Sequence, residues 1–178
     1  MNWNELWGEL IIEELVLHGT ECFCISPGSR STPLTLAIAK NSLAKSVVIN
    51  DERASAYYAL GHARANGRPA VLICTSGTPT ANYLPAVIEA SVEQIPMLVL
   101  TSDRPPELRD TGANQAINQS FIFGKHVRWY FDPGCPCPEF KVEALLSTID
   151  HAISKTYSPL PGPVQLNFPF RDPFFDNF

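Results

Sequence analysis

The chain has 178 residues, of which 45% are hydrophobic and 17% are charged, and its net charge is -5. This length suits one domain with a real core, and the composition indicates a globular chain rather than a disordered one. The charge offers no electrostatic footprint for nucleic acid, and no apolar run approaches the roughly 20 residues of a membrane span. Acidic residues interrupt the first stretch and no basic segment precedes it, so we expect no signal peptide and a cytoplasmic location.

The first half of the chain predicts alternating helices and strands. Apolar residues at helical spacing predict a helix over 3–17 that ends at His18-Gly19. We expect Asp51 to cap a later helix and Gly67 to end it. The other expected elements are a strand at 22–25, a helix over 33–40, a strand at 46–49 and the capped helix over 52–66.

The second half continues the alternation. The expected elements are a strand at 70–74, a helix over 79–91, a strand at 96–100, a short helix over 119–123, a strand at 127–131, a helix over 142–156 and a strand at 164–167. The strands are continuous apolar runs, which is typical of a parallel sheet that is covered on both faces. The pattern predicts an α/β fold: a doubly wound, mostly parallel sheet with helices on both faces.

We expect one domain over residues 1–170, followed by the aromatic, proline-interrupted tail 171–178. The tail is either the start of a linker that docks on a missing neighbour or a segment folded back on this domain. The five cysteines have no CxxC spacing, and an odd number favours free thiols in a reducing compartment. Cys135 and Cys137 would need two further ligands to hold a metal, so we expect no metal site in this chain.

Four polar or charged segments follow four expected strands: SPGSRST, NDER, TSGTPTAN and TSDRPP. In an open α/β sheet, ligands bind at the carboxyl ends of the strands. Arg30 lies near the start of the helix that Ser31 or Thr32 can cap, where a cation is unfavourable. An anion beside Arg30 would relieve this, and it could be a ligand carboxylate or a protein acid.

Arg104 repeats this arrangement after another strand. Two arginines at one sheet edge suit a substrate with more than one carboxylate, although a salt bridge of Arg104 with Asp103 or Glu107 is the alternative. Considered by itself, Glu52 is an ordinary residue for the first turn of a helix, where a negative charge is favourable. TSGTPTAN can bring backbone close to a ligand, but it lacks the lysine of a P-loop. The amides in GANQA could bind a ligand or satisfy loop backbone.

Taken in order and spacing, the runs SPGSRSTPL, NDERASAYYALGHA, CTSGTPTANYLPAVIEA, LTSDRPPEL and GANQAI resemble one family. It is that of the 2-succinyl-5-enolpyruvyl-6-hydroxy-3-cyclohexene-1-carboxylate (SEPHCHC) synthases, thiamine-diphosphate enzymes of menaquinone biosynthesis. The resemblance covers about residues 3–169 and concerns the pyrimidine-binding (PYR) domain only. Pro79 departs from the family, in which alanine is expected at that position.

The resemblance implies roles for particular residues. Glu52 would be catalytic: a buried glutamate with a raised pKa that hydrogen-bonds N1′ of the cofactor's aminopyrimidine. The implied cofactor-binding residues are Glu52, Ser76, Gly77, Thr78 and Asn82. The implied substrate-binding residues, on the isochorismate side, are Ser29, Arg30, Arg104, Asn114 and Gln115.

The implied reaction decarboxylates 2-oxoglutarate on thiamine diphosphate and adds the product to isochorismate. The Mg²⁺ or Mn²⁺ and diphosphate sites would lie outside this chain, in the diphosphate-binding domain of a second subunit of a homo-oligomer. We therefore expect the isolated chain to be inactive. Two alternatives are a PYR domain of the acetolactate-synthase type and a non-catalytic module that binds a carboxylate ligand or a partner.

Overall fold

The computed structural model describes residues 2–176, so the last two residues of the tail considered above lie outside it. Six parallel strands form one sheet in the order β2-β1-β3-β4-β6-β5. The strands are β1 (Phe23–Ile25), β2 (Ser46–Val48), β3 (Ala70–Cys74), β4 (Met97–Asp103), β5 (Trp129–Phe131) and β6 (Pro163–Pro169). The expected α/β fold with a parallel sheet is confirmed, and every described strand pair is parallel.

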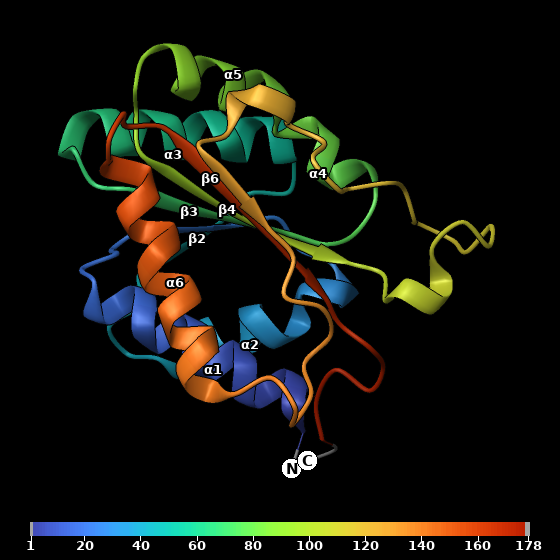
Figure 1. Ribbon diagram of the computed structural model, residues 1–178. Coiled ribbons are helices and arrows are strands. Elements are labelled where there is room, and N and C mark those ends of the chain that lie inside the picture. Colours follow the sequence, from blue (N-terminus) through green and yellow to red (C-terminus); the bar gives the residue numbers. More distant parts are fainter. Residues whose placement is uncertain (1, 177–178) are drawn as a thin grey trace.

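Helices cover both faces of the sheet (Figure 1). The α-helices are α1 (Trp3–Leu17), α2 (Thr32–Lys40), α3 (Glu52–Asn66), α4 (Thr78–Asn82), α5 (Leu84–Val92) and α6 (Val142–Tyr157). Three short 3₁₀ helices are Ser29–Ser31, Pro106–Leu108 and Gly124–His126. None of the helices in residues 2–176 combines the length and the apolar character that crossing a membrane would require.

The strands divide their side chains between two cores. Phe23 and Ile25 of β1 join the core under α1, α2 and α6, whereas Cys22 and Cys24 join the core under α3 and α5. β3 and β4 divide their residues in the same way. Because successive side chains of a strand point to opposite faces, a fully buried strand must be apolar at every position. This explains the continuous apolar runs in the sequence.

Local signals account for most element boundaries. Oδ1 of Asp51 accepts a hydrogen bond from the backbone N–H of Ala54 (2.8 Å), so the predicted cap of α3 is confirmed. Gly67 has a φ of 65°, a left-handed conformation that glycine adopts without strain. Ser31 takes the predicted N-cap position of α2, but its hydroxyl donates to the carbonyl of Gly28 (2.9 Å) and accepts no hydrogen bond from the first turn of the helix.

The largest differences from the expected elements concern three segments. The helix expected over 79–91 is divided at Tyr83 into α4 and α5, with a proline in the first turn of each. The strand expected at 96–100 continues to Asp103, since β6 pairs with it over seven residues. Residues 119–123 form turns rather than the short helix that their sequence suggested.

The described part of the tail lies against this domain. Nη1 of the buried Arg30 donates to the carbonyl of Phe170 (2.7 Å) and to Oδ2 of Asp172 (3.0 Å). The Arg30 guanidinium also lies 4.5 Å from the ring centroid of Phe174. Nδ2 of Asn4 in α1 donates to the backbone carbonyls of residues 171 and 173. Residues 170–176 thus fold back on α1 and on the loop after β1, and the role of this segment as a linker stays a prediction.

Replacing Arg30 with methionine tests how strongly it holds the tail. The substitution leaves the buried Phe170 carbonyl without this donor, so we expect the free energy of unfolding to fall by about 1–3 kcal/mol. Urea titration followed by circular dichroism measures the change. The matched control is Arg68→Met, which removes an exposed ion pair with Glu21 and should cost no more than about 1 kcal/mol. Equal losses in the two variants would contradict a structural role for Arg30.

Candidate functional site

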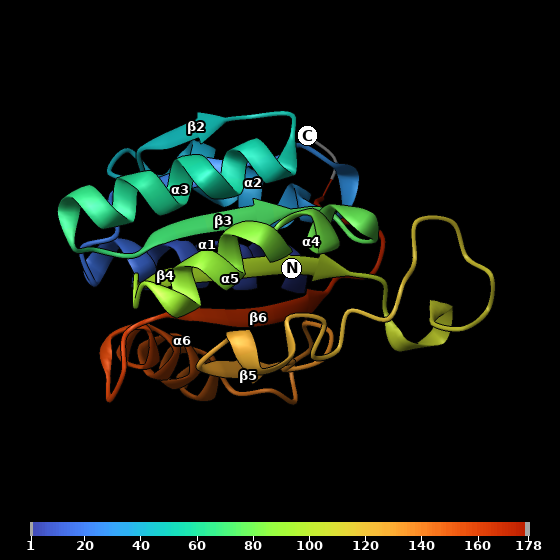
Figure 2. The same cartoon turned by 90° about the horizontal axis from the view of Figure 1, so that it is seen from above.

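Four candidate loops begin at nearly the same level of the sheet. Ile25 at the end of β1 is in register with Val48 of β2 and Ile73 of β3, and Cys74 at the end of β3 is in register with Thr101 of β4. Because β2, β1, β3 and β4 are consecutive neighbours and all parallel, their following loops share one edge. Figure 2 shows α4 beyond the tip of β3 and the loop after β4 projecting from the same edge. The predicted convergence of these segments is confirmed.

Glu52 begins α3 at this edge. Its Oε2 accepts a hydrogen bond from Nδ2 of Asn82 in α4 (3.1 Å), and no other hydrogen bond of this carboxylate is present within residues 2–176. The residue is half-buried, so the full burial expected of it is not found in this chain. A half-buried carboxylate with one amide donor can still accept a hydrogen bond from a ligand nitrogen. Glu52 therefore fits a group that requires a carboxyl partner, such as a protonated ring nitrogen.

Ser76 and Gly77 are tied to the long loop that follows β4. Oγ of Ser76 donates to the carbonyl of Gln115 (3.0 Å), and Nε2 of Gln115 donates to the carbonyl of Ser76 (3.0 Å). Gly77 has a φ of 93°, and an added Cβ would lie 3.0 Å from Cγ of Gln115. Glycine is thus required here by conformation and by space. These polar groups hold the loop in place, and their contact with a cofactor stays a prediction.

Gln119 is a structural residue of the site that the sequence analysis missed. It is 1% exposed, and its Oε1 accepts a hydrogen bond from the backbone N–H of Gly77 (2.7 Å). Its Nε2 donates to the carbonyl of Ser102 (3.1 Å) and to Oδ1 of Asn167 (2.9 Å). One amide therefore links the loops or strand ends of β3, β4 and β6. Only its place in the fold distinguishes Gln119 from the exposed polar residues around it.

The two arginines have different surroundings. The partners of Arg30 are the tail groups described above, so the anion beside it is a protein acid, Asp172. Burial, and then the charge of Arg104, lower the pKa of Arg30, whereas the charges of Asp172 in the tail and of Asp103 raise it.

Arg104 has neither of the ion pairs considered for it. Asp103 pairs with Arg109 (3.0 Å), and Glu107 pairs with Arg171. The backbone N–H of Arg104 donates to Oδ1 of Asp103 (2.7 Å), but its Nε is buried and has no hydrogen-bond partner among the described residues. Leaving a buried donor unpaired costs about 1–3 kcal/mol. Nε of Arg30 is also buried and unpartnered, but its Nη1 already has two acceptors, so of these two arginines Arg104 is the one without an ion pair among the described residues.

Asp103 fixes the end of β4 below Arg104. Burial raises its pKa, while the amide of Asn167 and the charge of Arg109 oppose that rise. Nδ2 of Asn167 donates to Oδ2 of Asp103 (2.9 Å) and to Oδ2 of Asp132 (3.0 Å). The network sets where the backbone leaves the sheet toward Arg104.

The remaining predicted site residues are open to solvent. Ser29, Thr78 and Asn114 are exposed, and their side chains make no hydrogen bond within the described part of the chain. A cavity of about 130 Å³ lies under the loop after β4, lined in part by Ala113, Ile117 and Gln119. It is smaller than the ligand pockets of about 300–1,000 Å³ found in proteins, and its lining includes neither Glu52 nor the two arginines. The polar edge is thus an open surface.

Comparison with known proteins identifies a family that matches this chain. Residues 7–122 match the family described as "Thiamine pyrophosphate enzyme, N-terminal TPP binding domain". Three similar relatives are named 2-succinyl-5-enolpyruvyl-6-hydroxy-3-cyclohexene-1-carboxylate synthase. They come from Chlorobium phaeobacteroides (58% identity over 95% of this chain), Chlorobaculum tepidum (57% over 94%) and Rubrobacter xylanophilus (54% over 96%).

The aligned region covers 29%, 29% and 30% of these three relatives, so the chain spans less than a third of their length. The family match includes β1 to β4, the carboxylate of Glu52 and the loop clamped by Gln119. The chain belongs to the family of thiamine pyrophosphate enzymes, as an N-terminal TPP binding domain.

Proposed function

We propose that this chain is the pyrimidine-binding domain of a SEPHCHC synthase. The observation that carries the proposal is 58% identity over 95% of the chain to a relative with that name. The proposed reaction of the whole enzyme is decarboxylation of 2-oxoglutarate and addition of the resulting four-carbon unit to isochorismate. The open edge beside Glu52 supports this, because such a surface can be one wall of a site that another domain completes.

Thiamine diphosphate, when bound, supplies the electron sink for decarboxylation of a 2-oxo acid. The residue of this chain that would hold a proton against its pyrimidine ring is Glu52. Asn82 donates to one oxygen of that carboxylate, which orients it. The buried loop of Ser76 and Gly77 would lie beside the ring, with the exposed Thr78 and Asn82 at the start and end of α4. Closing this edge with a second protein surface would exclude water from the carboxyl group.

Arg104 is the proposed contact for a carboxylate of isochorismate. Its buried Nε lacks a partner, and a guanidinium can bind a carboxylate through two parallel hydrogen bonds. Arg30 adds positive potential nearby, although its own hydrogen bonds go to the tail. Ser29 and Asn114 are exposed at the same edge, and Gln115 directs its amide to Ser76. These residues would form the substrate side of the site.

The rest of the proposed assembly lies outside this chain. A diphosphate-binding domain from a second subunit of a homo-oligomer would hold the diphosphate through Mg²⁺ or Mn²⁺. The proposed location is the cytoplasm. This division explains why Glu52 is only half-buried in the chain by itself.

A chimera tests the proposed function. The aligned 29% of the Chlorobaculum tepidum relative is replaced by this chain, and turnover is measured with isochorismate and 2-oxoglutarate, and with pyruvate alone. We expect SEPHCHC formation and none of the acetolactate type of product. In this chimera Glu52→Gln should lower kcat by about 10²–10⁴-fold, because the amide cannot hold the proton that the carboxyl shares with the ring.

The control for that substitution is Glu89→Gln, an exposed carboxylate on α5, which should leave kcat unchanged. A well-folded chimera that uses pyruvate but not isochorismate would reject the proposed substrate. Full activity of the Glu52→Gln chimera would reject the role of that carboxyl.

Arg104→Ala in the same chimera tests the substrate side. Loss of a hydrogen-bonded charge pair should raise KM for isochorismate by about ten- to a hundredfold, with little change in KM for 2-oxoglutarate. Initial rates at varied concentrations of each substrate measure the two values. The matched control is Arg64→Ala, whose ion pair with Glu93 is exposed. A rise confined to 2-oxoglutarate would contradict the assignment.

Cofactor binding by the chain alone tests the division of the site. We expect no saturable heat when thiamine diphosphate and Mg²⁺ are titrated into the 178-residue chain in a calorimeter. The reason is that the binding free energy of the diphosphate and the metal would come from another domain. Micromolar binding by this chain would contradict the proposed division.

A further inference from the structure

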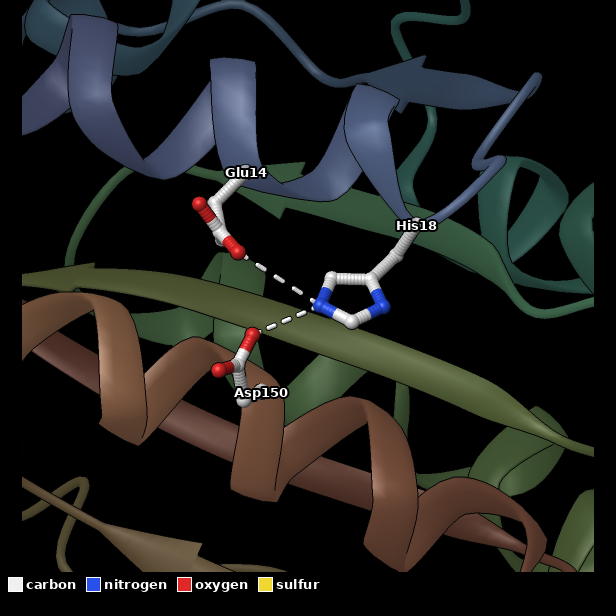
Figure 3. A group of neighbouring side chains, drawn as sticks. All are labelled: Glu14, His18 and Asp150. Atoms are coloured by element: carbon white, nitrogen blue, oxygen red, sulfur yellow. Dashed lines mark hydrogen bonds and ion pairs between the residues drawn. The ribbon is translucent and has the colours of Figure 1, made fainter.

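A second cluster of polar side chains lies away from the candidate site. Glu14 and His18 are at the carboxyl end of α1, and Asp150 is in α6. Nε2 of His18 lies 2.6 Å from Oδ1 of Asp150 and 3.5 Å from Oε1 of Glu14. Figure 3 shows both carboxylates directed at the same ring nitrogen, with the other nitrogen pointing away. Because α1 ends just before β1 begins, the cluster lies toward the amino ends of the strands, opposite the edge that carries Glu52.

The cluster has more negative charge than its positive groups balance. Within residues 2–176, neither Glu14 nor Asp150 forms an ion pair with a lysine or arginine, so His18 is the shared partner of both. The last turn of α1 contains no basic residue, and Glu13 adds a further negative charge there. A helix carboxyl end carries partial negative charge and favours a cation. The negative potential at this cluster therefore favours a bound positive ion.

The protons available to the cluster are too few for its acceptors. One N–H of the imidazole faces two carboxylates, so the two acceptors compete for one hydrogen. A divalent cation in place of that hydrogen would bind all three groups at once.

The donor set and spacing fit a first-row transition metal. The three ligand atoms lie within 4.8 Å of one another, and the cluster is partly open, so water can complete the coordination. Bonds of about 2.0–2.2 Å at tetrahedral angles place ligand atoms about 3.3 Å apart, which small side-chain shifts can reach here. An imidazole ligand favours Zn²⁺, Cu²⁺ or Ni²⁺ over Mg²⁺ and Ca²⁺, which prefer oxygen alone.

We propose that Glu14, His18 and Asp150 form a binding site for a divalent transition metal of the Zn²⁺ class, which cross-links α1 to α6. The ion would be structural, because the cluster lies at the far end of the sheet from the candidate active edge. Since both helices pack over the same core, joining them would stabilise that face of the domain.

Calorimetric titration of the metal-free, reduced chain with ZnCl₂ tests the proposal. We expect one equivalent to bind, and a higher thermal unfolding midpoint that EDTA reverses. His18→Gln and Asp150→Asn should each weaken binding by about tenfold or more, since loss of a group that merely orients a ligand already costs about 10–100-fold. All three ligands are partly exposed, so both variants should fold, and circular dichroism checks this.

Two controls separate this site from other zinc ligands. His62→Gln removes a histidine of α3 outside the cluster, and Cys135→Ser with Cys137→Ser removes the two partly exposed thiols. Both controls should keep the zinc equivalent. Absence of binding by the unsubstituted chain, unchanged binding by His18→Gln, or loss of binding in the double serine variant would each overturn the proposal.

Discussion

The alignment of parallel strands is the constraint on which the candidate site depends. Neighbouring strands β2, β1, β3 and β4 are parallel and end at nearly the same level, so the loops with Glu52, Arg30, Ser76 and Arg104 leave the sheet side by side. Parallel strands need crossover helices, and those helices bury both faces of the sheet. The polar groups of the loops are thereby left at the carboxyl edge of the sheet. The chemistry of the edge follows from the topology before any single side chain is considered.

The sequence predicted the elements that local rules control. The helix 52–66 was predicted with its bounds, because Asp51 caps it and Gly67 ends it through contacts within a few residues. The N-cap position of α2 at Ser31 was predicted as well, but not the hydrogen bond of its hydroxyl, which donates to the carbonyl of Gly28. The extension of β4 to Asp103 depends on its pairing with β6, 66 residues later in the chain. Boundaries set by distant partners are not visible in a local pattern.

The site was predictable in its placement but not in its hydrogen bonding. The sequence indicated that both arginines lie at the sheet edge, yet it treated them as equivalent. In the structure Arg30 forms an ion pair with the tail. Both candidate partners of Arg104 instead pair with other arginines, Arg109 and Arg171. Gln119 was missed for a related reason, because its three partners come from loops and strands that are far apart in the sequence. Competition among side chains for partners is decided only when the tertiary fold brings them together.

The contrast between buried polar groups that have hydrogen-bond partners and those that lack them suggests where a ligand or another chain would bind. Asp103 is buried, but an amide, an arginine and a backbone N–H compensate it, so its burial is a matter of stability. The Nε of Arg104 is also buried, and no group of the described chain compensates it. The fold therefore bears an unfavourable free energy at Arg104 that an acceptor from outside would remove. Nε of Arg30 and Oγ of Ser102 are also buried without a partner, so the argument for Arg104 as a ligand contact rests in addition on its lack of an ion pair among the described residues.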